Sequence, residues 1–151
     1  MRIELSNEIF FAEVERMIGE GQRVTIPVKG FSMRPMMCSE KDKVTLTAHT
    51  DKDIKRGAVM LFKHKGHHIM HRIVGIEGDR ITFAGDGNYR ITEQAAREDI
   101  VAKVTAIIRP SGRTVSLDSH RWRVYSAIWL ALPRIVRRYI LGVANKLKLW
   151  I

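Results

Sequence analysis

The sequence predicts a mainly β protein with a short N-terminal helix and a basic, amphipathic helical C-terminal tail. Short stretches of apolar and alternating residues recur through residues 22–118, separated by turn residues and without alternating helices. Residues 1–19 carry apolar side chains at helical spacing, and residues 119–151 hold seven Lys and Arg but no Asp or Glu. We therefore expect one domain over residues 1–118, followed by a tail over residues 119–151.

The N-terminal segment is acidic and amphipathic. Its apolar residues at helical spacing are Phe10, Phe11, Val14 and Ile18. They predict a helix over about residues 5–19, capped by Ser6 or Asn7 and ended by Gly19 or Gly21. A secretory signal would need a basic start and an unbroken apolar stretch. We therefore expect neither a signal peptide nor an N-terminal membrane anchor here.

The predicted β core covers about residues 22–110. Six stretches in it suit strands, at residues 23–29, 43–48, 58–63, 68–77, 80–84 and 100–109. Turn signals lie between them, at Lys65-Gly66, at 77–79 (EGD) and at 85–88 (GDGN). Residues 91–99 (ITEQAARED) predict a helical turn or a loop. Consecutive short strands without crossover helices favour an antiparallel arrangement.

The tail carries most of the net charge of +10. Its longest uncharged stretch, residues 124–133, is about ten residues, whereas a bilayer span needs about 20. From Ile135 the apolar residues form a helical stripe with arginines between them, and Pro133 suits the first turn of that helix. Two interpretations stay open: an interfacial helix on an anionic membrane, or a helical hairpin packed on the body. We expect a cytoplasmic protein, peripheral to the membrane in the first case, and no nucleic-acid partner.

The sharpest local signal for chemistry is VKGFSMRPM at residues 28–36. Gly30 lets the backbone turn and Pro35 fixes the exit, which presents Ser32 on a constrained loop. By itself, such a residue is more often an ordinary turn serine.

Two later residues belong with this serine. His71 lies in an apolar strand, on the same face as Ile69 and Ile73, where a lone histidine is more often a packed side chain. Asp86 lies in the GDGN turn, where an aspartate is usually structural. The order of the three residues is more informative than any one of them.

That order resembles the signal peptidase I and LexA-type serine peptidase superfamily. Its members carry G-x-S-M-x-P, then D-x-V, G-D-x-V, a strand with the general base, and a G-D-x-N turn. Here the corresponding segments are GFSMRP (30–35), DKV (42–44), GAVM (57–60), HRIV (71–74) and GDGN (85–88). The resemblance covers about residues 22–108 and implies that superfamily's antiparallel β domain.

Within the superfamily, the base is Lys in most bacterial and LexA-like members. In the endoplasmic-reticulum and archaeal type it is His, followed by Arg and an aliphatic pair, and residues 71–74 resemble this type. The resemblance therefore implies a Ser32–His71 pair with Asp86 as the third member. The further Asp that this type carries beyond the turn is absent, and Glu93 is the less favoured alternative.

The chemistry agrees with this assignment. A serine hydroxyl needs an adjacent base to act as a nucleophile, and an imidazole is largely neutral near pH 7. A carboxylate on the far ring nitrogen would hold the tautomer. Because Gly30 replaces the serine of many signal peptidases, the oxyanion would rest on backbone N–H groups such as that of Ser32. We expect an extended peptide substrate, with Phe31, Met33 and Met36 lining a shallow groove for small or apolar side chains.

No cofactor is expected, and the single cysteine excludes a disulfide scaffold. His64, His67, His68 and His71 could suggest a metal, but no cysteine pair or acid completes a zinc site in that stretch. Two alternatives to a serine endopeptidase stay open. One is an inactive peptide- or membrane-binding module on the same fold. The other is a LexA-like self-cleaving regulator, although residues 1–21 are too short and acidic for a DNA-binding domain.

Overall fold

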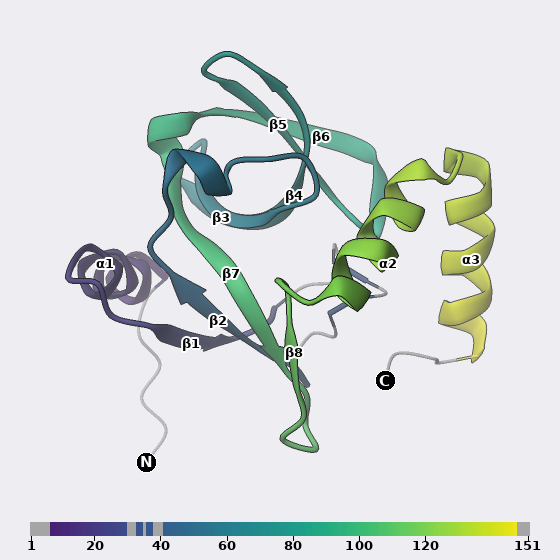
Figure 1. The fold of residues 1–151 in the computed structure, drawn as a ribbon, viewed down its shortest axis with the longest axis horizontal. Helices are drawn as coiled ribbons and strands as arrows, with labels where there is room; N and C mark the ends of the chain where they lie inside the picture. The colour runs from purple at the N-terminus through teal and green to yellow at the C-terminus, as the bar shows by residue number, and fades with distance from the viewer. Residues whose placement is uncertain (1–6, 30–32, 35, 38–40, 148–151) are drawn as a thin grey trace.

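The computed structural model describes residues 7–29, 33–34, 36–37 and 41–147. Eight strands in these residues form one antiparallel sheet in the order β1-β2-β7-β3-β4-β5-β6, with β8 paired to β7 (Figure 1). The strands are β1 (Val24–Pro27), β2 (Lys43–Thr47), β3 (Val59–His64), β4 (His67–Glu77), β5 (Arg80–Gly85), β6 (Asn88–Ala96), β7 (Ile100–Ile108) and β8 (Thr114–Ser116). The helices are α1 (Asn7–Gly19), α2 (His120–Ala131) and α3 (Arg134–Leu147), with 3-10 turns at Asp51–Asp53 and Arg97–Asp99. The predicted mainly β chain with a short N-terminal helix and C-terminal helices is confirmed.

Strand β7 joins the two parts of the sheet. Its first half pairs with β3, and its second half pairs with β2 on one side and β8 on the other. Register shifts occur at Thr45/Leu46 and at Leu61/Phe62, where β2 and β3 meet β7. Such irregularities increase the local twist, and β7 can therefore serve two differently oriented groups of strands.

Strands β3, β4, β5 and β6 curl so that β6 returns close to β3 (Figure 1). Inside the curl, the rings of Phe62 and Phe83 stack with centroids 3.8 Å apart. Met60, Ile73 and Ile81 are fully buried with them. We call this group the small cluster. Met60 and Phe62 of β3, and Ile81 and Phe83 of β5, are two residues apart in their strands and so face the same side, as expected from the period of two in side-chain direction.

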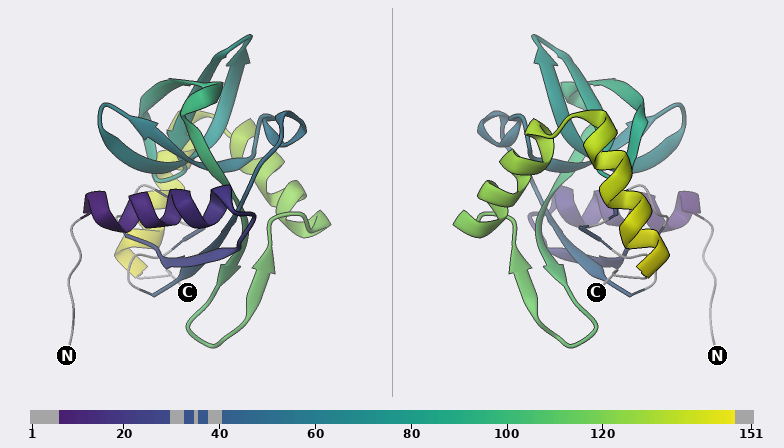
Figure 2. Two further views of the ribbon diagram at one scale, coloured as in Figure 1. Left: turned by 90° about the vertical axis from the view of Figure 1, so that its left-hand side faces the viewer. Right: turned by 90° about the vertical axis from the view of Figure 1, so that its right-hand side faces the viewer.

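The larger hydrophobic cluster lies between the β1–β2–β7 part of the sheet and the helices. Val14 and Ile18, one turn apart on α1, are buried in it, as are Trp122 and Trp129 of α2 and Leu141 of α3. Helix α1 lies on one side of the molecule, and α2 and α3 lie on the opposite side (Figure 2). Helices on both sides thus cover the apolar surface that the sheet itself leaves open.

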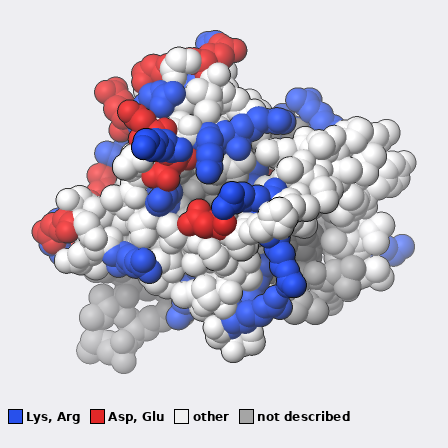
Figure 3. Space-filling model, viewed as in Figure 1, with Lys and Arg blue, Asp and Glu red and all other residues white. Residues whose placement is uncertain are grey.

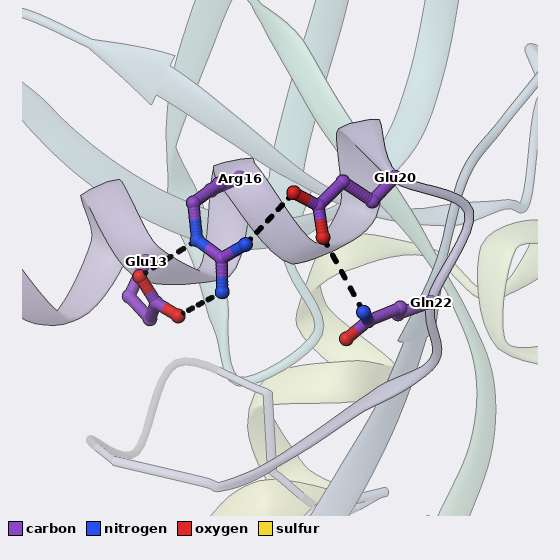
Figure 4. Close-up of polar contacts among 4 residues, drawn as sticks. All are labelled: Glu13, Arg16, Glu20 and Gln22. Atoms are coloured by element: carbon purple, nitrogen blue, oxygen red, sulfur yellow. Dashed lines mark hydrogen bonds and ion pairs between the residues drawn. The ribbon is translucent and has the colours of Figure 1, made fainter.

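Helix α1 carries an ion-pair network on its exposed surface (Figure 4). Arg16 bonds Glu20 at 2.8 Å one turn ahead and Glu13 one turn behind, and Gln22 donates to Glu20 at 3.3 Å. Pairs at this spacing support a short helix, which needs such help because isolated helices of this length are marginal. Within the described residues the helix covers Asn7–Gly19, and it ends at the predicted Gly19.

The tail forms two helices, as its pattern predicts. The Ser119 hydroxyl accepts a 3.2 Å hydrogen bond from the Trp122 amide and so caps α2. Helix α3 begins directly after Pro133. Arg137 of α3 donates to the carbonyls of Leu130 and Leu132, which satisfies the C-terminal end of α2. Among the helices of the described residues, none combines the length and apolarity that a membrane span requires.

The structure differs from the prediction at residues 91–99. These residues continue strand β6 as far as Ala96, and the helical turn is confined to Arg97–Asp99. Strand β8 was not predicted either. Residues 91–96 form a strand because pairing with β5 satisfies their backbone hydrogen-bonding groups. This gain outweighs the helix propensity of the Glu, Gln and Ala residues in the segment.

Candidate functional site

His71 lies within β4, opposite Met60 of β3, and is only 5% exposed. It lies on the strand face of Ile69 and Ile73, which pack in the small cluster, as the sequence predicts. The centroid of the Phe62 ring is 6.5 Å from that of the imidazole. The fold therefore holds this imidazole in a nearly water-free position between β3 and β6.

Glu93 of β6 supplies the carboxylate that contacts His71. Its Oε2 lies 2.8 Å from Nδ1 of His71, and the two side chains are 12% and 6% exposed. In the sheet, Glu93 pairs with Phe83 and Phe83 pairs with Ile73, so β5 lies between the two residues. The curl of β3–β6 brings them together across the inside of the sheet.

This contact selects a tautomer of the imidazole. An ionised carboxylate only accepts hydrogen bonds, so Nδ1 of His71 donates to Glu93. In the neutral ring, the lone pair is then on Nε2, the nitrogen farther from Glu93. With this tautomer, Nε2 could accept a proton from a nucleophile, and the carboxylate would stabilise the imidazolium that forms.

The structure places Asp86 on Arg72 instead of on His71, which corrects the expected third member. Oδ1 and Oδ2 of Asp86 accept hydrogen bonds of 2.8 and 2.7 Å from Nε and Nη2 of Arg72. The two side chains are 2% and 0% exposed. Arg72 follows His71 on β4 and so points to the opposite face of the strand, where the Asp86 turn also lies. A buried guanidinium requires a charged partner, and the bidentate pair occupies both oxygens of Asp86.

Arg72 joins β4 to several other segments. Its Nη1 donates to the Gly57 carbonyl and to the Ser126 hydroxyl of α2, each at 2.8 Å. Its Nη2 contacts Sδ of Met36, and its guanidinium carbon lies 5.6 Å from the centroid of the Trp122 ring. The residue next to the candidate base is therefore the point at which β4, α2 and the loop around Met36 are fixed to one another.

The charge of Asp86 also acts on α2. Burial raises the pKa of Tyr125, and the nearby Asp86 carboxylate raises it further, against smaller opposing effects of Arg72 and Arg109. The phenol of Tyr125 consequently stays neutral throughout the physiological pH range.

The candidate nucleophile Ser32 and its neighbour Phe31 lie outside the described residues. Directly after them, Met33 and Met36 are each 2% exposed and Met37 is fully buried. All three belong to the larger hydrophobic cluster. The side chains of Met33 and Met36 thus pack the core, and their expected role in lining a shallow groove stays a prediction.

Contacts on two sides hold the segment that follows Ser32. On one side, Met36 meets Arg72, the residue next to His71. On the other, Arg34 donates a 3.2 Å hydrogen bond to Oδ1 of Asn145 on α3. Met36 also borders a pocket of about 510 Å³, together with Trp122 and Tyr125 of α2.

The remaining histidines of the 64–71 stretch have other surroundings. His64 pairs with His67 beside the β3–β4 turn. His68 Nε2 lies 2.7 Å from Oε1 of Glu15, and its ring stacks on Phe11 with centroids 4.4 Å apart. His68 thus attaches α1 to β4. Among the described residues, no group of three or more His, Cys, Asp or Glu is arranged to hold a metal ion.

Glu93 is the site residue that sequence reasoning undervalued. A signal was present, since Ile91, Glu93 and Ala95 alternate with polar residues, as on one face of a strand. A carboxylate inside that alternation, beside the buried Ala95, indicates a paired acid. Interpreting residues 91–99 as a turn concealed it.

Comparison of the sequence with models of known protein families and with curated proteins finds no match, so a function has to be argued from the site itself.

Proposed function

We propose that this protein is a serine endopeptidase in which Ser32 is the nucleophile, His71 the general base and Glu93 the orienting carboxylate. The observation that carries the proposal is the buried contact of 2.8 Å between Nδ1 of His71 and Oε2 of Glu93. Burying an imidazole and a carboxylate costs hydration, and their contact fixes the histidine tautomer as in a Ser-His-acid site.

The nucleophile segment supports the same proposal. GFSMRP at residues 30–35 resembles the nucleophile motif of signal-peptidase-like enzymes. The described residues after Ser32 are anchored through Met36 to Arg72, one residue from His71. Arg72 and Asp86 would then be positioning residues, because they hold the loop and β4 in place without contacting the reacting atoms.

The proposed reaction is acyl transfer. Oγ of Ser32 attacks the carbonyl carbon of a peptide bond while His71 Nε2 takes the hydroxyl proton. The same proton passes to the leaving amine as the C–N bond breaks. A water molecule, deprotonated by His71, then hydrolyses the ester and restores the serine. Backbone N–H groups, that of Ser32 among them, would stabilise the oxyanion.

An extended peptide is the substrate class that fits this fold. In the described sheet β1 is an end strand, paired on one side with β2, and it leads directly toward the segment with Ser32. A strand edge binds peptides through main-chain hydrogen bonds, leaving selectivity to pockets for alternate side chains. The pocket beside Met36 is lined by Trp122 and Tyr125 of α2 and also by Arg109, Arg113 and Arg121, so its lining is both aromatic and basic.

The test is labelling of the folded full-length protein with a fluorophosphonate, combined with cleavage of a peptide library monitored by mass spectrometry. Ser32→Ala and His71→Ala should abolish both signals while leaving thermal unfolding nearly unchanged for Ser32→Ala. Ser111→Ala, at an exposed turn serine, is the matched control and should behave as wild type. Full cleavage by Ser32→Ala, or no labelling and no cleavage by folded wild-type protein, would overturn the proposal. The second result would favour a binding module on the same fold.

A further inference from the structure

Helix α3 exposes an unusually apolar surface. Six large apolar side chains on it are between 37% and 69% exposed, namely Ile135, Val136, Tyr139, Ile140, Val143 and Leu147. Their successive spacings of one, three, one, three and four residues place them on one side of the helix. We call them the α3 apolar face. Leu141 and Ala144, which are buried, attach the opposite side of α3 to the body.

The packing of α3 therefore does not account for its amphipathic pattern. A helical hairpin packed on the body would bury its main apolar stripe, whereas this helix buries two residues and leaves six outside. Contiguous exposed apolar surface of this kind marks a contact with a partner or a membrane.

Charge indicates which partner fits. Arg134, Arg138 and Lys146 are exposed on the same helix as the α3 apolar face. Residues 119–147 contain no acidic residue at all. In Figure 3 the right-hand part of the surface, where α2 and α3 lie, shows Lys and Arg in blue and uncharged residues in white but no red Asp or Glu, which gather elsewhere. The complement of this surface is apolar and negatively charged.

We propose that the α3 apolar face binds the surface of an anionic lipid bilayer. Fourteen residues of helix are about 21 Å long, less than the roughly 30 Å of a hydrocarbon core, so α3 would lie along the interface with its apolar side chains among the acyl chains. Arg134, Arg138 and Lys146 would meet the lipid phosphates. A second copy of this chain fits less well, because two such faces in symmetric contact would bring cations against cations.

Binding in this orientation also concerns the candidate site. Asn145 of α3 accepts a hydrogen bond from Arg34, two residues after Ser32. The segment next to the proposed nucleophile would thus be held near the lipid surface. The membrane proposal does not depend on the peptidase proposal, since it concerns a different set of side chains.

The experiment is co-sedimentation of the full chain with vesicles of phosphatidylcholine, alone or mixed with phosphatidylglycerol. Wild type should bind the mixed vesicles and lose binding as salt is raised. Tyr139→Glu/Val143→Glu should weaken binding at least about tenfold, because the two apolar contacts are replaced by charges. The matched control, Ile9→Glu/Ile91→Glu, adds the same charge at exposed apolar residues of α1 and β6 and should bind nearly as wild type.

A second pair of variants isolates the charge. Arg134→Glu/Arg138→Glu should weaken binding about tenfold or more, whereas Lys52→Glu/Lys55→Glu, with the same change in net charge, should not. Circular dichroism shows whether each variant is folded. No vesicle binding by folded wild type would overturn the proposal, and so would equal binding to neutral vesicles. A dimer in sedimentation velocity that the α3 variants abolish, without vesicle binding, would instead identify a second copy as the occupant.

Discussion

Glu93 and His71 lie on strands that are not neighbours in the sheet, yet Oε2 and Nδ1 of these residues are 2.8 Å apart and largely shielded from water. The contact depends on the curl of β3–β6 and not on local sequence spacing. The two carboxylates near β4 therefore have different partners. Glu93 contacts the imidazole of His71, and Asp86 neutralises the buried guanidinium of Arg72.

The first prediction concerns Glu93→Gln. The amide can still contact His71 but cannot stabilise an imidazolium, so kcat for peptide cleavage should fall by roughly 10²–10⁴. The urea unfolding midpoint should move little. Both quantities are measurable on the same purified protein. Activity at the wild-type level in Glu93→Gln would remove Glu93 from the site.

Asp86→Asn should produce the opposite pattern, a loss of stability. The Arg72 side chain is fully buried, and removing its charged partner leaves that charge uncompensated. Breaking such a pair costs about 3–5 kcal/mol, which urea denaturation at pH 7 would detect. Asp79→Asn, at an exposed turn position, is the control and should change stability by less than about 0.5 kcal/mol. A fully stable Asp86→Asn protein with a large loss of kcat would return Asp86 to the catalytic group.

His71→Lys should not restore the peptide cleavage that His71→Ala loses. Many members of the superfamily that the sequence resembles nevertheless use lysine as the general base. A lysine base has to be neutral to accept the serine proton, and a carboxylate at the position of Glu93 stabilises the charged ammonium instead. Fluorophosphonate labelling rates of the wild type, His71→Lys and His71→Ala make the comparison. Labelling of the lysine variant at the wild-type rate would contradict the assigned role of Glu93.

The attachment of α1 to the sheet should weaken in acid. Burial would raise the pKa of Glu15, but hydrogen bonds from His68 and Lys63 outweigh it and hold that pKa below its ordinary value of 4.5. Because the folded pKa is depressed, the stabilisation is complete above the unfolded value and is lost as pH falls through the folded value. The carboxyl is about one-third exposed, so the contribution is about 1 kcal/mol.

The measurement is the difference in unfolding free energy between the wild type and Glu15→Gln across pH. This difference should be near 1 kcal/mol at pH 7 and should approach zero once the pH is well below 4.5. Glu8→Gln, exposed on the same helix, is the control. A difference that does not vary with pH would show that the side chain acts through packing alone.

Much of the fold could be predicted from the sequence, because its strands are short, apolar and separated by strong turn signals. Lys65 and Gly66, for example, both have positive φ in the β3–β4 turn that they predict. The β6 strand was missed because its backbone pairing with β5, not its composition, decides its conformation. The resemblance implied Asp86 as the partner of His71, but it does not reveal that Arg72 is buried. Because a buried guanidinium needs a charged partner, Asp86 pairs with Arg72.

The adjacency of His71 and Arg72 has a consequence for how β4 tolerates change. Side chains of neighbouring strand residues point to opposite faces, so one register places the imidazole beside Glu93 and the guanidinium beside Asp86 together. Sliding β4 by one residue would exchange the two faces and bury a guanidinium in the small cluster while removing the imidazole from its acid. An insertion or deletion in the β3–β4 turn is therefore a more severe change than its distance from His71 suggests, because a single shift would disable the proposed chemistry and the scaffold at once.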